Sequence, residues 1–269
     1  MELIRQIEHR PMNDDQLSIY FIGQSGYVIK TKDCTLYIDP YLSDYIENPI
    51  GLNDPYMMRN YPPPFLPSEI QKLDAVICTH AHVDHMDPWT LNQIRQNFCF
   101  YVSDGAYEKS AFQLDLSKIT FLVPQETYEF PPFTIMPIPA AHYELTDEKG
   151  RPDCLSILIQ WKEKTLFFWG DGIVYDGQID LLSQFKFNYF FAPINGRDPN
   201  REERGIIGNI NGDELIALCS NLSIEYIIPN HYDMFKNNTG SVASFQRELK
   251  QRNPNQSIVI MKCGDKIEL

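Results

Sequence analysis

Short apolar runs of four to eight residues recur along the whole chain, and they constrain its fold more than any other feature. They are rich in Val, Ile, Phe and Tyr and are bounded by Gly, Pro, Asp or Asn, which is typical of strands. We therefore expect strands at LSIYFIG, GYVIK, TLYID, DAVICTH, FCFYVS, ITFLV, FTIMPIP, SILIQW, TLFFWGD, FNYFFAPI, EYIIPNH and SIVIMKCG.

Helical patterns fall between some of these runs. Strands that first follow one another directly and then alternate with helices indicate an α/β fold, with helices covering two packed sheets. A chain of 269 residues suits one large domain or two small ones, and we expect a single domain over 1–269. The helices are expected at about Pro88–Gln96, Asp104–Leu114, Gln178–Phe185, Gly212–Leu222 and Val242–Arg252, with Asp104 and Ser241 as N-caps.

The charge balance limits the class of partner. With 36 acidic and 23 basic residues the net charge is −13, which repels a phosphate polyanion at long range. We therefore expect no nucleic-acid partner, although a local Arg cluster can still hold a small anion. No apolar run approaches the ~18 residues of a membrane span, and the first residues lack a signal pattern. These features predict a cytoplasmic protein without membrane association.

The stretch Tyr41–Pro67 does not fit the pattern of strands and helices. It contains IENPIGLNDPYMMRNYPPPFLP, whose prolines forbid regular structure. A long irregular loop in an enzyme is typically a lid, so we predict a lid-like insertion over residues 41–67. An extended surface strap is the equal alternative.

Three of the six histidines lie in one short motif, His80-Ala81-His82-Val83-Asp84-His85. The motif follows an apolar strand-like run and precedes a helix-like segment, so it occupies a strand-to-helix loop. Two residues apart on an extended segment, His80 and His82 point the same way. Asp84 and His85 lie past the bend and can face a second ion. Four potential ligands in six residues predict a site for Zn, Mn or Fe rather than a set of isolated polar residues.

Three further ligand-type side chains follow later strand-like runs. His142 follows Ile135–Ala141, Asp171 lies between two glycines after Thr165–Trp169, and His231 follows Tyr226–Asn230. Side chains at strand ends are held by rigid backbone yet remain open to a ligand. Alone, each would be an ordinary core histidine or an Asp-Gly turn. With the first cluster, they predict one metal centre.

The ordered set His80-x-His82-x-Asp84-His85, then His142, Asp171 and His231, resembles the metallo-β-lactamase superfamily. Asp39 matches an early structural Asp of that superfamily. The resemblance implies a four-layer αββα sandwich with a two-metal site at one edge. It further implies that His80, His82 and His142 hold a first divalent ion, that Asp84, His85 and His231 hold a second, and that Asp171 bridges them.

A narrower resemblance, to the L-ascorbate-6-phosphate lactonase branch, rests on three motifs. It implies hydrolysis of the lactone ring of a phosphorylated sugar acid by metal-activated hydroxide, an anionic small-molecule substrate, and a homo-oligomeric assembly. The motifs are FAPINGR at 191–197, GNIN at 208–211 and IPNHYDMF at 228–235.

Residue types suggest roles around such a metal site. Asp84 is a candidate to orient the nucleophile or move a proton, and Tyr232 to donate a hydrogen bond to the developing oxyanion. Asn195, Arg197 and Arg201 lie in the most Arg-dense segment and are the candidate phosphate ligands. The alternative for the arginines is surface pairing with nearby acidic residues. The alternative functions are a metal-dependent phosphodiesterase and a non-catalytic metal-dependent sensing or binding module.

Overall fold

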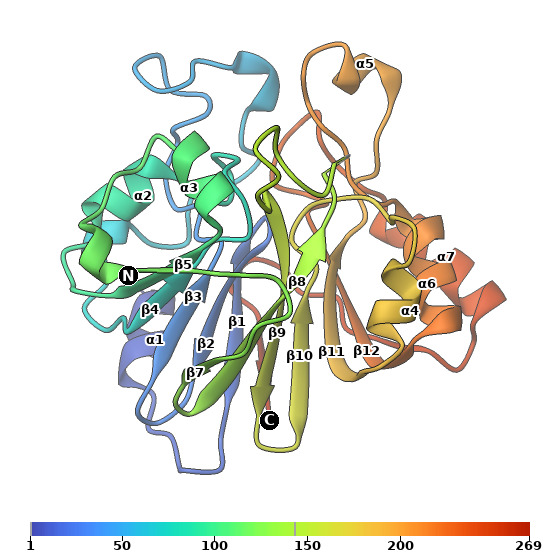
Figure 1. Ribbon diagram of the computed structural model, residues 1–269, viewed down its shortest axis with the longest axis horizontal. Helices are drawn as coiled ribbons and strands as arrows, with labels where there is room; N and C mark the ends of the chain where they lie inside the picture. The colour runs from blue at the N-terminus through green and yellow to red at the C-terminus, as the bar shows by residue number, and fades with distance from the viewer. Residues whose placement is uncertain (1, 143) are drawn as a thin grey trace. The chain divides into compact units, whose positions relative to one another are not determined.

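The computed structural model describes residues 2–142 and 144–269, which form two compact units (Figure 1). Unit 1 comprises Met1–Leu122, Met234–Asn237 and Met261–Leu269, and unit 2 comprises Val123–Asp233 and Asn238–Ile260. Each unit holds one mixed sheet flanked by helices, which confirms the predicted α/β fold class. Among the described residues, no helix has the length and apolar character required to cross a bilayer.

The sheet of unit 1 has, among the described residues, seven strands in the order β14-β1-β2-β3-β4-β5-β6. Strands β14, β1, β2 and β3 pair antiparallel, and β3, β4, β5 and β6 pair parallel. The carboxyl ends of β3 and β4 therefore lie side by side. The strands are β1 (Ser18–Gly23), β2 (Gly26–Lys30), β3 (Thr35–Ile38), β4 (Ala75–Ile77), β5 (Cys99–Val102), β6 (Ile119–Phe121) and β14 (Lys266–Glu268).

Helices α1 (Glu2–His9), α2 (Pro88–Gln93) and α3 (Asp104–Lys109) belong to unit 1 (Figure 1). Each contributes apolar side chains to one buried cluster with the strands, and burial of that surface is what stabilises such short helices. The cluster includes Ile4 and Ile7 of α1, Leu91 of α2 and Ala106 of α3, together with Tyr20, Tyr37, Val76 and Phe100 of the sheet. Three 3₁₀ turns, Pro55–Met57, Pro67–Glu69 and Leu116–Lys118, complete the unit.

The sheet of unit 2 repeats this plan over the described residues, in the order β13-β12-β11-β10-β9-β8-β7. Strands β7 to β10 pair antiparallel, and β10 to β13 pair parallel. The carboxyl ends of β10, β11 and β12 therefore meet at one edge of the sheet. The strands are β7 (Tyr128–Phe130), β8 (Phe133–Ala140), β9 (Cys154–Trp161), β10 (Lys164–Phe168), β11 (Lys186–Pro193), β12 (Ser223–Asn230) and β13 (Ser257–Ile258).

Helices α4 (Gln178–Leu182), α6 (Gly212–Asn221) and α7 (Val242–Arg252) lie beside the parallel half of this sheet (Figure 1). Their apolar side chains pack with aromatic side chains of β10 and β11 in one buried cluster. Phe167 stacks on Phe190 with ring centroids 4.8 Å apart, and it also contacts Phe187 and Trp169. Helix α5 (Pro199–Glu202) is a single turn in the loop after β11.

The structure corrects several element boundaries. Helix α7 matches its predicted range, and Ser241 caps it by accepting from Ser244 N. The prediction of Asp104 as an N-cap is wrong, because Ser103 accepts from Ala106 N and Asp104 is the first helical residue. Helices α2, α3 and α4 each end three to five residues before the predicted ends. Helices α1 and α5 and strands β7 and β14 were not predicted.

The segment 41–67 is irregular, as its prolines predict, apart from one 3₁₀ turn at Pro55–Met57 and the first residue of the turn at Pro67–Glu69. Arg59 holds it together: its guanidinium donates to the carbonyls of Tyr61, Ser43 and Tyr41 and lies 4.7 Å from the Tyr41 ring centroid. Backbone bonds from Asn60 N to Met234 O and from Lys236 N to Met58 O join the segment to residues 234–237 of the same unit. Its role as a lid stays a prediction.

Helix α1 is anchored by a buried carboxylate. Glu8 is 4% exposed, and its Oε1 accepts from Gln71 N at 2.5 Å and from Lys72 N at 3.0 Å. The Lys30 and Lys72 ammonium groups donate to the Glu8 carbonyl. An eight-residue helix has little stability of its own, so this contact supports the packing of Ile4 and Ile7.

We expect Glu8→Ala to lower the free energy of unfolding by about 1.5–3 kcal/mol, since two partly buried hydrogen bonds to a charged acceptor would be lost. Urea denaturation measures this difference. Gln6→Ala, at an exposed position of the same helix, is the matched control and should change stability by less than about 0.5 kcal/mol. Equal effects of the two substitutions would contradict the anchoring role.

Candidate metal centre

The loop between β4 and α2 carries four of the predicted ligands. His80 and His82 follow the strand, and a tight turn, with His85 N and Met86 N both donating to His82 O, brings Asp84 and His85 back toward them. The imidazole centroids of His80 and His82 are 4.6 Å apart, and those of His80 and His85 are 4.2 Å apart. Asp87 then caps α2 by accepting from Trp89 N, and Pro88 occupies the first turn. The sequence therefore ends the loop sharply and starts the helix.

Asp39 lies at the centre of the hydrogen bonds that shape this loop. It follows β3 with a left-handed backbone (φ 44°) and is 1% exposed. Its Oδ1 accepts from Thr79 N at 2.8 Å, and its Oδ2 accepts from Thr79 Oγ1 and from His85 Nδ1, both at 2.7 Å. Because β3 and β4 are parallel neighbours, residues 40 positions apart in sequence meet here.

These partners determine which imidazole nitrogen faces a ligand. His85 Nδ1 bonds to Asp39, so the proton belongs on Nδ1 and the lone pair on Nε2. His85 Nε2 lies 3.7 Å from Asp84 Oδ2. His80 Nδ1 bonds to Thr79 Oγ1 at 3.0 Å, which orients His80 in the same way. A carboxylate or hydroxyl behind each imidazole is the usual arrangement around metal-binding histidines.

Asp84 has a partner that the sequence did not reveal. Gln24 Nε2 donates to Asp84 Oδ2 at 2.7 Å, and both side chains are buried. Gln24 lies in the turn between β1 and β2 with φ 56°. A polar Gln-Ser pair between two glycines and two fully buried strands is the signal that could have singled it out.

Cys78 lies two residues before His80, and a thiolate there would be a strong ligand. Burial raises the pKa of the Cys78 thiol, and the carboxylates of Asp39 and Asp87 raise it further. Its Sγ contacts the His85 carbonyl at 3.4 Å. The thiol therefore stays protonated and serves as packing.

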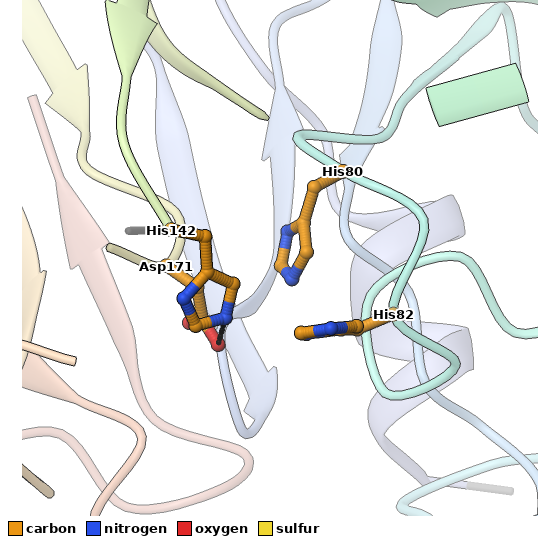
Figure 2. A group of neighbouring side chains, drawn as sticks. All are labelled: His80, His82, His142 and Asp171. Atoms are coloured by element: carbon orange, nitrogen blue, oxygen red, sulfur yellow. Dashed lines mark ion pairs between the residues drawn. The ribbon is translucent and has the colours of Figure 1, made fainter. Parts of the chain in front are cut away.

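Unit 2 places the other three predicted ligands at the ends of its strands. Asp171 Oδ2 lies 3.4 Å from His231 Nε2 and 3.8 Å from His142 Nε2. Figure 2 shows His142 with Asp171 from this unit, and His80 with His82 from unit 1. The turn around Asp171 requires glycine: Gly172 has φ 140°, and a Cβ there would lie 2.5 Å from Ala141 O. Ile173 N donates to that same carbonyl and so joins the His142 strand end to the Asp171 loop.

The predicted substrate-binding side chains all have intramolecular partners. Arg197 forms a two-pronged pair with Glu214 at 2.7 and 2.9 Å. Burial disfavours the ionised form of Glu214, but hydrogen bonds from Arg197 and the Asn211 backbone outweigh it and lower the pKa. Arg201 is 8% exposed and pairs with Asp198 at 2.5 Å. Their binding of substrate stays a prediction, as does the catalytic role of Tyr232, which is buried at the end of β12.

The donor set suits a divalent cation. Unit 1 offers His80, His82, Asp84 and His85, and unit 2 offers His142, Asp171 and His231. Neutral imidazole with carboxylate is the ligand chemistry of Zn, Mn and Fe. The carboxylate and hydroxyl partners behind His85 and His80 fit these metals too.

Comparison with known proteins identifies the family. A family model described as "Beta-lactamase superfamily domain" matches residues 35–232, a range that contains every candidate ligand. This chain belongs to that superfamily. The family resemblance seen in the sequence is thereby confirmed, and nothing in the match points to the lactonase branch in particular. Among the curated proteins, none matches this chain.

Solved structures with this metallo-β-lactamase fold include three of different kinds. Igni18, a metallo hydrolase from Ignicoccus hospitalis, has a TM-score of 0.67 at 18% identity over 94% of this chain and 98% of its own. Isothiocyanate hydrolase from Delia radicum gut bacteria has a TM-score of 0.71 at 19% identity over 93% and 98%. CmlA, a diiron β-hydroxylase from Streptomyces venezuelae, has a TM-score of 0.64 at 14% identity over 97% and 55%. The chain shares this fold, and its His and Asp side chains are candidate metal ligands.

We expect Asp39→Asn to weaken metal binding about 10–100-fold while the protein still folds. The Asn oxygen can still accept from Thr79 N, but its amide would donate to His85 Nδ1 and move the imidazole proton to Nε2, the ligating atom. Competition with a chromogenic chelator measures the affinity. Asp33→Asn, at an exposed position before β3, is the control. Unchanged affinity in Asp39→Asn would contradict this role.

Proposed function

We propose that the chain holds two divalent ions and uses them to open the lactone ring of a phosphorylated sugar acid. His80, His82 and His142 would hold one ion, Asp84, His85 and His231 the other, and Asp171 would bridge them. The observation that carries the bridging role is the position of Asp171 Oδ2, within 4 Å of the Nε2 atoms of both His142 and His231. One carboxylate facing two imidazoles is what a bridging ligand requires.

Two bound divalent ions lower the pKa of water toward neutrality and polarise a substrate carbonyl. The residues of this chain supply the proton handling. Gln24 fixes Oδ2 of Asp84, and Oδ1 of Asp84 would take the proton of the attacking water. The Tyr232 phenol would donate a hydrogen bond to the carbonyl oxygen as it gains negative charge. Each role needs a side chain held in one orientation, and both side chains are buried.

Two features support a phosphorylated lactone as the substrate: the reactivity of its carbonyl and the Arg197 guanidinium. Attack of the hydroxide on the lactone carbonyl would break the ring C–O bond, and the proton held by Asp84 would pass to the released alkoxide oxygen. A phosphate on that substrate would meet Arg197, 32% exposed, which already binds the Glu214 carboxylate through both terminal nitrogens. A guanidinium that holds a carboxylate in this way has the fork geometry that phosphate requires.

We expect His82→Ala to lose both bound metal and hydrolysis, since an imidazole of the first set would be absent. Elemental analysis and turnover are measured on the same preparation. His9→Ala is the matched control, because His9 is exposed and lies outside the ligand pattern. Wild-type metal content and turnover in His82→Ala would contradict the assigned site.

Turnover of three substrates by metal-reconstituted protein tests the reaction class: L-ascorbate 6-phosphate, its unphosphorylated lactone, and a chromogenic phosphodiester. The proposal predicts turnover of the phosphorylated lactone above both others. Turnover of the phosphodiester alone would replace it with the phosphodiesterase function.

We expect Arg197→Ala to raise KM for the phosphorylated lactone about tenfold or more, because a charge-assisted hydrogen bond is lost, with little change for the unphosphorylated lactone. Steady-state kinetics on the two substrates gives the ratio. Arg252→Ala removes a comparable pair, Arg252 with Asp213, on the surface of the same unit and should leave both KM values unchanged. Equal changes for the two lactones would exclude Arg197 from phosphate binding.

A further inference from the structure

Four buried polar side chains form one hydrogen-bonded chain inside unit 2. Asn209 is fully buried, and Asn195, Asn238 and Arg201 are 4–8% exposed. Such groups are costly to bury unless each is satisfied, and here they hydrogen-bond to one another, which makes the set rigid. Two of the four, Asn195 and Arg201, are residues whose types had suggested substrate binding.

The series of hydrogen bonds begins at the peptide that follows Asp171. Gly172 N donates to Asn209 Oδ1 at 2.9 Å, and Asn209 Nδ2 donates to Asn195 Oδ1 at 3.1 Å. Asn195 Nδ2 then donates to Asn238 Oδ1 at 2.7 Å. Asn209 and Asn195 each accept with the side-chain oxygen and donate with the nitrogen, so the orientation of each depends on the next residue in the series.

Arg201 closes the far end. Its Nη1 donates to Asn238 Oδ1 at 2.6 Å and its Nη2 to the Asn195 carbonyl at 3.0 Å, while Nε pairs with Asp198. Asp198 in turn has a lowered pKa, chiefly because Arg201 donates to it. The guanidinium therefore donates to three partners within the unit, and the Asp198 carboxylate balances its positive charge.

The sheet topology explains why this series of hydrogen bonds reaches the loops that carry the metal ligands. Strands β10, β11 and β12 are parallel neighbours, and Asp171, Asn195 and His231 follow their carboxyl ends in that order. Asn195 thus follows the middle strand, between the two ligand-bearing loops that follow β10 and β12. Backbone bonds add to it: Ile194 N donates to Asn230 O, and Ile210 N donates to Gly172 O.

We infer that Asn209 and Asn195 are positioning residues for the metal ligand Asp171 and do not contact substrate. This inference rests on the proposed function, in which Asp171 binds metal. Asn209 fixes the Asp171–Gly172 peptide through its N–H, and Ile210 fixes the same glycine through its carbonyl. Since Gly172 has φ 140°, a conformation that leaves the glycine few restraints of its own, the Asp171–Gly172 peptide plane depends on the bond to Asn209. The bond from Ile210 N holds the next peptide, Gly172–Ile173. The Asp171–Gly172 plane sets the direction of the Asp171 side chain.

The test is the metal affinity of Asn209→Ala and Asn195→Ala, measured by chelator competition on metal-free protein. A misoriented ligand weakens metal binding about 10–100-fold. Positioning therefore predicts a Kd raised by that factor, with KM at saturating metal unchanged. Using both variants keeps the test informative if one of them fails to fold.

Asn188→Ala is the matched control. Asn188 lies on β11, near the end of the strand opposite to the one that Asn195 follows. Its side-chain oxygen accepts from Thr165 N of β10, and its nitrogen donates to Glu225 of β12. It should lower the apo-protein melting temperature as Asn209→Ala does, yet leave the metal Kd within about twofold, since loss of stability alone does not misplace a ligand.

Three results would overturn the inference. Unchanged metal Kd in both Asn209→Ala and Asn195→Ala would overturn it alone. A raised KM for Asn195→Ala at wild-type Kd would overturn it by returning Asn195 to substrate binding. Wild-type protein that binds no metal would overturn the proposed function together with it. If the protein binds metal but does not hydrolyse the lactone, the proposed reaction fails, while the metal Kd values of the variants still test the positioning role. The failure of the proposed function and the failure of this inference can therefore be told apart.

Discussion

The Asp39 carboxylate is the group on which the rest of the unit 1 site depends. It accepts from Thr79 N, Thr79 Oγ1 and His85 Nδ1 in a buried position, so it fixes both ends of the loop that carries the histidines. A buried carboxylate is stable only if hydrogen bonds replace its water, and these three do so. They simultaneously assign the His85 proton to Nδ1. The shape of the loop after β4 and the ligand character of His85 therefore both depend on this one carboxylate.

In unit 2, the groups next to the candidate ligand Asp171 that orient it are neutral amides. Asp171 is directed by the peptide after it, and that peptide is held by an amide chain through Asn209, Asn195 and Asn238 to Arg201. Amides both donate and accept, so they can transmit an orientation across three strand ends without placing another charge beside the ligands. In each unit, candidate ligands follow the ends of parallel strands, and buried polar groups orient Asp171 in unit 2 and His85 in unit 1.

The sequence predicted most of the strands and the candidate ligands that follow them, because both predictions use local patterns. Apolar runs identify strands, and the His and Asp side chains stand directly after them. It did not predict α1, because eight residues with Ile4 and Ile7 form a helix only when packed on the sheet. It placed the end of α2 at Gln96, but Ile94 is extended and buried in the core. Gln24, Asn209 and Asn238 were missed because their partners lie far away in sequence; the pairing of Gln24 with Asp84 spans 60 positions.

Anomalous diffraction from crystals of manganese- or zinc-loaded protein would show whether seven side chains of this protein bind two metal ions. We expect two anomalous peaks, with Asp171 contacting both ions, His80, His82 and His142 contacting one, and Asp84, His85 and His231 contacting the other. A single peak, or peaks that leave Asp171 uncoordinated, would contradict the proposed two-metal site.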